Sequence, residues 1–434
     1  MFTTRARFLK CAPQNLGYIG QSMPASIRQL LVSLGLLFAG HGLSQTLVPV
    51  FASQQGWSEE RLGLLGSAYF LGFVIGCLTV PKLLFRVGHV RVFLVLTGVT
   101  AACILLLRDL QQFGAWVVLR MLSGWCLAAI YTTAESWIND YAPNGQRGRL
   151  ISFYLLVSLL GMASGQVVFG MMPVQYLFAL ASLLVLLALI PVGLFCDDQP
   201  MTMPGSTFRL RSLGQVPFRA RAVMFVSGAV MGSVWTMTPL VIEASHLDLS
   251  DSGMIMMTVI IGGAVFQLPV GMAADRYGRK LVTNVLLLGG LAVSLFGVLR
   301  SFNHILELAV VMFLLGGASL SLYTMASSEA NDRSYLSRVE LATVLLLMNG
   351  VGSILGPLLT GVVMSWAPVG LFIVAAAMQA GLLLMLVRWQ EVPRERLLSS
   401  GLEGNGADVV AIEDYRDTEA PGIMADRGRR EQAS

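Results

Sequence analysis

Charged residues are scarce in this chain. Asp, Glu, Lys and Arg make up 12% of its 434 residues, whereas a soluble domain carries about 25%. Apolar residues make up 55%, and the mean hydropathy is +0.70. A soluble fold would have to hide more apolar surface than its own core can hold. The composition therefore excludes a soluble globular protein and indicates a polytopic membrane protein.

Cysteine and histidine are also few. The five cysteines have no paired spacing, and four of them lie in apolar runs or at their ends, which favours buried, inert thiols. The four histidines are scattered and have no metal-ligand spacing. No stretch resembles a nucleotide-binding loop or a catalytic triad. We therefore expect no cofactor, no metal site, no nucleic-acid partner and no enzymatic activity.

Long apolar runs, by contrast, are abundant. A membrane-spanning helix needs about 20 mostly apolar residues. Twelve runs meet this requirement, at 28–52, 61–82, 90–107, 112–137, 149–171, 174–196, 221–243, 250–273, 279–299, 304–329, 338–364 and 368–389. The predicted fold class is therefore an all-α polytopic membrane protein with twelve transmembrane helices that contact the lipid bilayer.

The longest internal connection, 197–220, divides these runs into six plus six. The predicted organisation is a leader at 1–27, a six-helix bundle at 28–196, a cytoplasmic linker at 197–220, a second bundle at 221–390 and a tail at 391–434. The tail mixes charged and small residues without a period and is predicted to be disordered. The leader lacks a cleavable-signal pattern, and Met23, directly before the first run, is an alternative start to Met1.

Lysine and arginine gather on one side of the predicted spans. Of the 29 cations, 25 lie in one set of connections or in the two termini. Only Arg61, Arg108 and Arg300 fall in the opposite set, and Arg120 lies within a span. Because basic loops stay in the cytoplasm, we expect both termini to be cytoplasmic and the protein to reside in the inner (plasma) membrane.

The chain also repeats itself at an offset of about 190 residues. Tyr131–Asp140 and Tyr323–Asp332 agree at six of ten positions. Three glycines of the 149–171 run recur in the 338–364 run at one constant offset, as the pairs Gly161/Gly352, Gly165/Gly356 and Gly170/Gly361. We infer two pseudo-symmetric bundles built as parallel repeats, an arrangement typical of transporters that rock two bundles about a central site.

One turn between two runs carries a recognisable motif, Gly271-x-x-x-Asp275-Arg276-x-Gly278-Arg279-Lys280. With twelve spans in a six-plus-six repeat, it resembles the signature of the major facilitator superfamily over residues 28–390. Arg120-x-x-x-Gly124 is similar to that family's second motif. The run from Tyr131 to Asp140, with Gln267-Leu-Pro269-x-Gly271, resembles the YcaD-like branch. The resemblance implies secondary transport by alternating access.

Two departures from the family pattern matter. The equivalent first-half turn has Phe85 where the signature has its Asp, so a carboxylate-dependent contact is expected in the second half only. The Gly-Pro-rich motif that antiporters carry in their fifth helix is missing there, and the pair Gly356-Pro357 lies in the eleventh instead. This weakens a direct transfer of drug/proton antiport.

The second-half turn is predicted to form a cytoplasmic latch. The resemblance implies that Asp275 meets free N–H groups at the start of the helix near Arg149, while Arg276 and Arg279 reach acidic residues at the end of the tenth helix. The alternative is a cation cluster that only sets topology and bends the chain sharply. The predicted latch residues are Asp275, Arg276, Gly278, Arg279, Lys280, Glu329, Asp332, Arg86 and Asp140.

The fourth helix carries a polar stripe. Arg120 and Glu135 are separated by about 22 Å of helical rise and by about 60° around the axis. Ionisable groups inside a membrane are costly and usually face a cavity or a partner. Arg120 is therefore predicted to bind an anionic group or sense a nearby protonation, and Glu135 to couple protons. Alternatively, Arg120 bonds carbonyls of a neighbouring helix and Glu135 pairs with Arg86.

Further polar residues fall on the first, fourth, seventh and tenth helices, which the resemblance places along the central path, and Asn349 falls on the eleventh. Each is also compatible with simple helix packing, and His41 with a proton carrier as well. The full set of substrate and coupling candidates is Arg120, Glu135, His41, Gln45, Tyr131, Trp235, Tyr323 and Asn349.

The predicted function is secondary active transport of a small solute across the inner membrane, driven by protons and carried out by a monomer. A small polar or anionic metabolite and an amphipathic drug-like compound both fit the polar set. A drug/proton efflux antiporter is one alternative. A membrane sensor or scaffold that kept the fold and lost transport is another. An intramembrane enzyme has little support, because no nucleophile–base pair is present.

Overall fold

The structure, a computed structural model, describes residues 25–141, 147–195, 211–334, 336 and 338–388. The chain consists of one compact unit, residues 1–383, and a second unit, residues 384–434. Of the second unit, only the last residues of a helix, 384–388, are described. The sites below all lie in the first unit. Most of the predicted leader (1–24 of 1–27), most of the predicted linker (197–210 of 197–220) and all of the predicted tail (391–434) lie outside the described residues.

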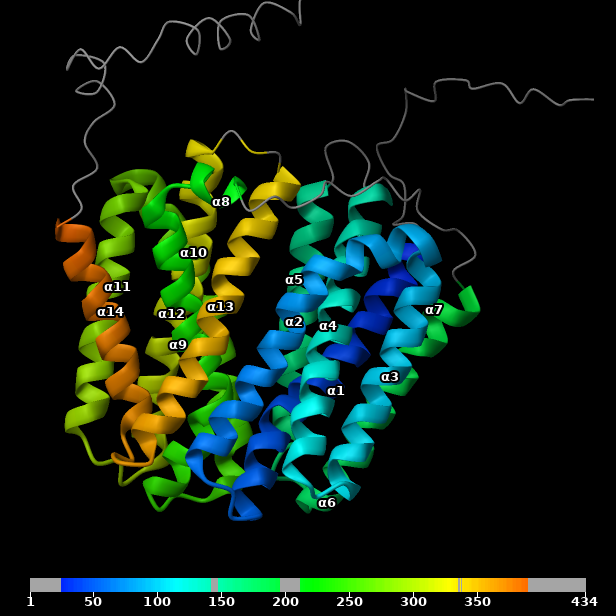
Figure 1. The fold of residues 1–434 in the computed structure, drawn as a ribbon, viewed down its shortest axis with the longest axis horizontal. Coiled ribbons are helices and arrows are strands. Elements are labelled where there is room, and N and C mark those ends of the chain that lie inside the picture. Colours follow the sequence, from blue (N-terminus) through cyan, green and yellow to red (C-terminus); the bar gives the residue numbers. More distant parts are fainter. Residues whose placement is uncertain (1–24, 142–146, 196–210, 335, 337, 389–434) are drawn as a thin grey trace, which may run out of the picture. The chain divides into compact units, whose positions relative to one another are not determined.

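Helices make up nearly all of the described chain (Figure 1). Those of the first half are α1 (Ala25–Gln54), α2 (Glu59–Val87), α3 (His89–Asp109), α4 (Phe113–Tyr141), α5 (Arg147–Val168), α6 (Val174–Leu187) and α7 (Leu189–Phe195). Those of the second half are α8 (Ser212–Gln215), α9 (Phe218–Ala244), η1 (Leu249–Asp251), α10 (Ser252–Tyr277), α11 (Arg279–Leu299), α12 (Ile305–Arg333), α13 (Arg338–Met364) and α14 (Gly370–Arg388).

Twelve of the described segments are long and apolar enough to cross a membrane, which confirms the predicted number of spans. The sixth span, predicted as one run at 174–196, is broken between α6 and α7. Pro191 explains the break, because it has no N–H to bond the Leu187 carbonyl and its ring crowds that carbonyl. The short helix α8 and the start of α9 at Phe218 lie within the predicted linker.

The repeat seen in the sequence recurs in how the helices pack. In the first half, a Cβ atom on Gly165 of α5 would overlap the carbonyl of Ala39 in α1. In the second half, a Cβ atom on Gly356 of α13 would overlap the carbonyl of Ala229 in α9. Ala39 and Ala229 are themselves 190 residues apart. The glycines therefore let equivalent helix pairs come together at equivalent places, as expected of small residues in membrane bundles.

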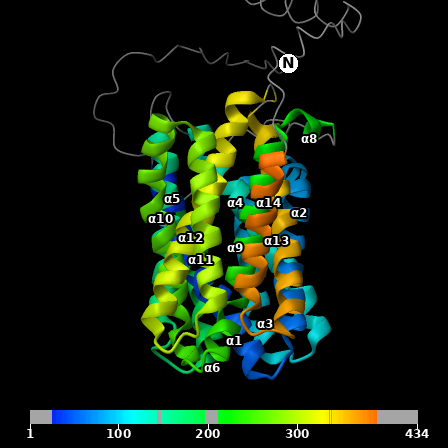
Figure 2. The same cartoon turned by 90° about the vertical axis from the view of Figure 1, so that its left-hand side faces the viewer.

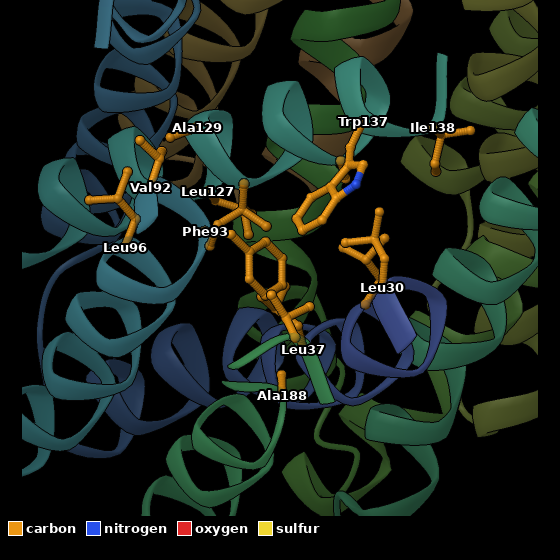
Figure 3. Close-up of a cluster of buried hydrophobic side chains, with 14 of the residues drawn as sticks. Leu30, Leu37, Val92, Phe93, Leu96, Leu127, Ala129, Trp137, Ile138 and Ala188 are labelled. Carbon is orange, nitrogen blue, oxygen red and sulfur yellow. The ribbon is translucent and has the colours of Figure 1, made fainter. Parts of the chain in front are cut away.

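Each half also has a closely packed apolar interior. Figure 3 shows this interior in the first half, where Leu37 of α1, Phe93 of α3, and Leu127 and Trp137 of α4 come together. All four side chains are at most 1% exposed. Lipid is as apolar as such a core, so the stability here comes from close fit and not from removal of water.

Several pairs of helices join the two halves, among them α2 with α13 and α5 with α10 (Figure 2), and α9 also contacts α1 and α2. Between α2 and α13, the Ser67 hydroxyl donates a hydrogen bond of 2.6 Å to the Ile354 carbonyl. Near it, a Cβ on Gly63 would lie 2.5 Å from the Pro357 carbonyl. Between α5 and α10, Gly253 packs against the Gln166 carbonyl.

These contacts lie towards one side of the membrane domain. Ser67 and Gly63 are in the first half of α2, whereas Arg86 lies at its other end. We call the side with Arg86, Arg279 and the other clustered cations the basic side; the sequence predicts that it is cytoplasmic. The contacts between the bundles named above therefore lie in the half of the helices away from the basic side.

Gly124 offers a test of this packing. Its added Cβ would overlap the Tyr69 carbonyl of α2, so Gly124→Ala should force α4 and α2 apart. We expect a loss of about 1–3 kcal/mol in stability, seen as a lower midpoint of thermal unfolding. The matched control is Gly98→Ala in α3, where an added Cβ meets open space; it should leave the midpoint unchanged or raise it. Equal midpoints for the two variants would contradict the packing described.

Candidate functional site

A buried arginine forms the centre of the candidate site. Arg120, in the first third of α4, is 6% exposed. Its Nη1 donates a hydrogen bond of 3.1 Å to Oε1 of Gln45 in α1. Its guanidinium carbon lies 4.4 Å from the ring centroid of Tyr69 in α2. The helices α1, α2 and α4 thus hold the cation between a carbonyl oxygen and an aromatic face, and no backbone carbonyl is among its described partners.

His41 belongs to the same cluster through Tyr69. Its Nε2 lies 3.4 Å from the Tyr69 hydroxyl, and the two rings are stacked with centroids 6.1 Å apart. His41 is 6% exposed and Tyr69 is 4% exposed. The sequence predicted His41 and Gln45 but missed Tyr69, since a tyrosine in an apolar run does not differ in sequence from one that only packs.

Side chains from both bundles meet beside Arg120. One cavity is lined by residues of both halves: Gln45, Phe70 and Arg120 from the first and Trp235 and Thr236 from the second. Its volume is about 10 Å³, which is about the space that one water needs. The predicted candidates Gln45, Arg120 and Trp235 are therefore together, at a cavity that is nearly closed in this conformation.

Glu135 occupies the other end of the polar stripe on α4. Its side chain is exposed. It lies within electrostatic range of Cys77 in α2, Tyr154 in α5 and Tyr323 in α12. Glu135 therefore faces residues of both halves, and the described contacts include no ion pair between it and Arg86.

Of the remaining candidates, Tyr131 and Asn349 have packing roles in this conformation. Tyr131 contacts Phe38 and Phe73, with ring centroids 5.0 and 6.2 Å away. Its repeat equivalent Tyr323 is partly buried. Asn349 donates a bond of 3.3 Å to the Met224 carbonyl, which ties α13 to α9 within the second half.

Three ion pairs lie at the basic side of the second half. Glu329, 3% exposed, pairs with Arg219 of α9 at 3.3 Å and with Arg333 at 3.9 Å. Arg279 pairs with Asp332 and donates a hydrogen bond of 2.7 Å to the Ser328 carbonyl. The sequence placed Arg279 near these acids but missed Arg219. Arg333 and Glu329 both lie in α12, and the other contacts join α9 or α11 to α12 within the same bundle.

The equivalent turns of the two halves share a backbone but differ in chemistry. Gly88 and Gly278 have φ angles of 91° and 84°, which favour glycine. Directly after them stand His89 and Arg279. His89 Nε2 lies 3.0 Å from the hydroxyl of Ser136, the repeat equivalent of Ser328. The first half thus has a histidine, His89, at the position where the second half has the permanently charged Arg279.

The other predicted latch residues are on the surface of the basic side. Asp275, Arg276, Lys280, Arg86 and Asp140 are exposed. The guanidinium of Arg276 lies over the ring of its neighbour Tyr277, 5.3 Å from the centroid. The side chains at the start of α5, including Arg149, lie outside those described, so the predicted contact between that helix start and Asp275 stays a prediction.

Twelve spans in two repeated bundles, with a cavity that both bundles line beside a buried arginine, define a polytopic membrane transport protein. The pattern of the Major Facilitator Superfamily matches residues 30–221 and again 221–419. The chain belongs to this superfamily. Its members are transporters and not enzymes, as the sequence predicted.

Relatives and solved structures agree with this assignment. The chain is 30% identical over 374 residues to an uncharacterized MFS-type transporter of Enterobacter sp. (strain 638), which covers 83% of this chain and 94% of that one. It is 28% identical over 365 residues, with the same coverage, to the uncharacterized MFS-type transporter YcaD of Escherichia fergusonii. These relatives confirm the YcaD-like branch.

Two solved structures share the fold. One is a mutant of the nucleoside transporter NupG, with a TM-score of 0.67, 16% identity and coverage of 84% of this chain and 99% of that one. The other is a bacterial homologue of the human lysosomal transporter Spinster, with a TM-score of 0.67, 15% identity and coverage of 86% and 100%.

The ion pair between Arg219 and Glu329 can be tested by mutation. Arg219→Gln would leave a buried carboxylate without its main partner, so we expect a loss of about 3–5 kcal/mol in stability. The control is Arg300→Gln, which breaks the exposed pair with Glu307 and should change the unfolding midpoint little. If the two variants unfold at the same temperature, Arg219 does not stabilise the second bundle in the way described.

Proposed function

We propose that the protein is a secondary active transporter that carries a small solute across the inner membrane by alternating access. The observation that supports this most is the position of the cavity beside Arg120, which lies where the two bundles touch and is lined by both. If the bundles rock apart there, the cavity opens away from the basic side. If they stay together there, access must come from the basic side.

The proposal includes orientation and stoichiometry. The basic side is cytoplasmic, because the clustered cations resist translocation, and both termini lie there. One chain is the functional unit, since both bundles that line the cavity come from the same chain. The exposed residues of the two turns, with Asp275 foremost, stabilise the closed state of the basic side.

Two pairs of spin labels test alternating access without knowledge of the solute. In a variant without native cysteines, one pair is placed away from the basic side, at Glu60→Cys and Ser365→Cys, and the other at the basic side, at Arg91→Cys and Leu281→Cys. Distances from double electron–electron resonance should show two populations for each pair. A change of conditions that shortens the distance of one pair should lengthen the distance of the other pair.

A variant serves as an internal check on the latch. Asp275→Asn should shift the basic-side pair towards its longer distance, and Asp248→Asn, on the other side, should not. One fixed distance for both pairs would contradict transport and favour the sensor or scaffold. Unchanged distance distributions in Asp275→Asn would contradict only the proposed latch.

Proton coupling is assigned to Glu135. It is an exposed carboxyl between residues of both bundles, so its protonation removes a charge from the central path. Lowering the pH from about 8 to about 5 should change the populations of the basic-side pair in the parent protein. Glu135→Gln should abolish this response and, with a transported solute, abolish pH-driven uptake while leaving exchange intact.

The control for this prediction is Glu307→Gln, at the start of α12. It removes a carboxylate that pairs with Arg300 away from the central path, so the pH response should persist. A response that survives in Glu135→Gln would exclude Glu135 as the coupling group.

A further inference from the structure

The charge of Arg120 is not balanced by any carboxylate that the structure describes. Its two described partners, the Gln45 amide oxygen and the Tyr69 ring, are neutral groups. The ion pairs of the described residues involve Arg219, Arg279, Arg300 and Arg333 but not Arg120. The cation is therefore held in place inside the membrane domain while its charge stays uncompensated.

One donor of this guanidinium is also unused. Arg120 Nε is buried and has no hydrogen-bond partner. A buried donor without a partner is costly, and more so when it is charged. A cation inside a membrane has a further cost because lipid cannot solvate it. Both costs fall if an anion binds to the guanidinium, whose planar set of donors suits a carboxylate.

The residues around Arg120 indicate which kind of anion can bind there. The cavity beside it is lined by Phe70 and Trp235, which offer apolar aromatic surface, and by Thr236 and Gln45, which are uncharged. A second anionic group on a ligand would find no second cation among these lining residues. The geometry therefore favours a single negative charge attached to an apolar or planar body.

We propose that the transported solute is a small organic monoanion whose carboxylate binds Arg120 and whose apolar part lies against Trp235 and Phe70. This proposal rests on the proposed function. In the present conformation the cavity holds about 10 Å³, too little for such a ligand. The anion therefore enters only after the bundles have moved apart beside Arg120, and its binding stabilises the state in which the cavity is open.

Matched sets of small molecules test the charge requirement. The acids are acetate, butyrate, benzoate and phenylacetate, each compared with its amide and with the corresponding amine at constant ionic strength. At least one acid should raise the midpoint of thermal unfolding of the purified protein, while its amide and amine do not. The same acid should lengthen the distance between labels at Glu60→Cys and Ser365→Cys.

Variants assign the effect to Arg120. Arg120→Gln should weaken binding of the active acid at least about tenfold. Arg120→Lys keeps the charge and should preserve the preference for acid over amide. It therefore serves as a control that separates the loss of the charge from a folding defect. The matched control is Arg61→Gln, which removes an exposed cation on the same side of the membrane domain and should leave binding unchanged.

The outcomes separate this proposal from transport itself. If no acid binds better than its amide and amine, or if Arg120→Gln binds the acid as well as the parent, the monoanion proposal is wrong. If an amide or amine binds instead and moves the labels, the transporter stands with another substrate class. If the labels move with pH but with no acid, again only the monoanion proposal fails.

Discussion

The structure depends on one constraint, the placement of a cation inside a membrane domain. Arg120 is held there by the ring of Tyr69 and the amide of Gln45, and this requires α4, α2 and α1 to lie close together. Gly124 makes that possible, because it lies one turn beyond Arg120 and packs on the backbone carbonyl of Tyr69. The motif Arg120-x-x-x-Gly124 is thus one physical unit: the glycine brings the two helices together, and the arginine lies over the aromatic ring.

Glycines that pack against backbone carbonyls also bring other helices of the molecule together. Equivalent glycines seat α5 on α1 and α13 on α9 within each half, and other glycines join α2 to α13 and α5 to α10 between the halves. Contacts of this kind have little directional bonding to break, so helices that meet through them can slide or separate at low cost. The charged contacts at the basic side, such as Arg219 with Glu329, instead fix helices within one bundle.

Much of this was predictable from the sequence, for physical reasons. Spans follow from apolar length, and the two halves follow from the constant offset of their glycines. Arg120, Gln45 and Trp235 were recognisable because polar or aromatic groups on presumed lining helices are unusual, and they do share one cavity. Tyr69 and Phe70 were not predictable, since aromatic residues in apolar runs usually pack against neighbours. Arg219 was missed as the partner of Glu329 because the pairing depends on how α9 and α12 are placed in space.

The central claim is that the cavity beside Arg120 is reached from each side of the membrane in turn. Thr236→Cys in a background without other cysteines places a small thiol in that cavity, where Thr236 is 6% exposed. The account predicts that a membrane-impermeant thiol reagent modifies it from either side. In a second experiment, α2 is linked covalently to α13 near Glu60 and Ser365. The link should prevent the reagent from reaching the thiol from the side away from the basic side, while the reagent still reaches it from the basic side. Modification from one side only, or access unaffected by the link, would contradict the account.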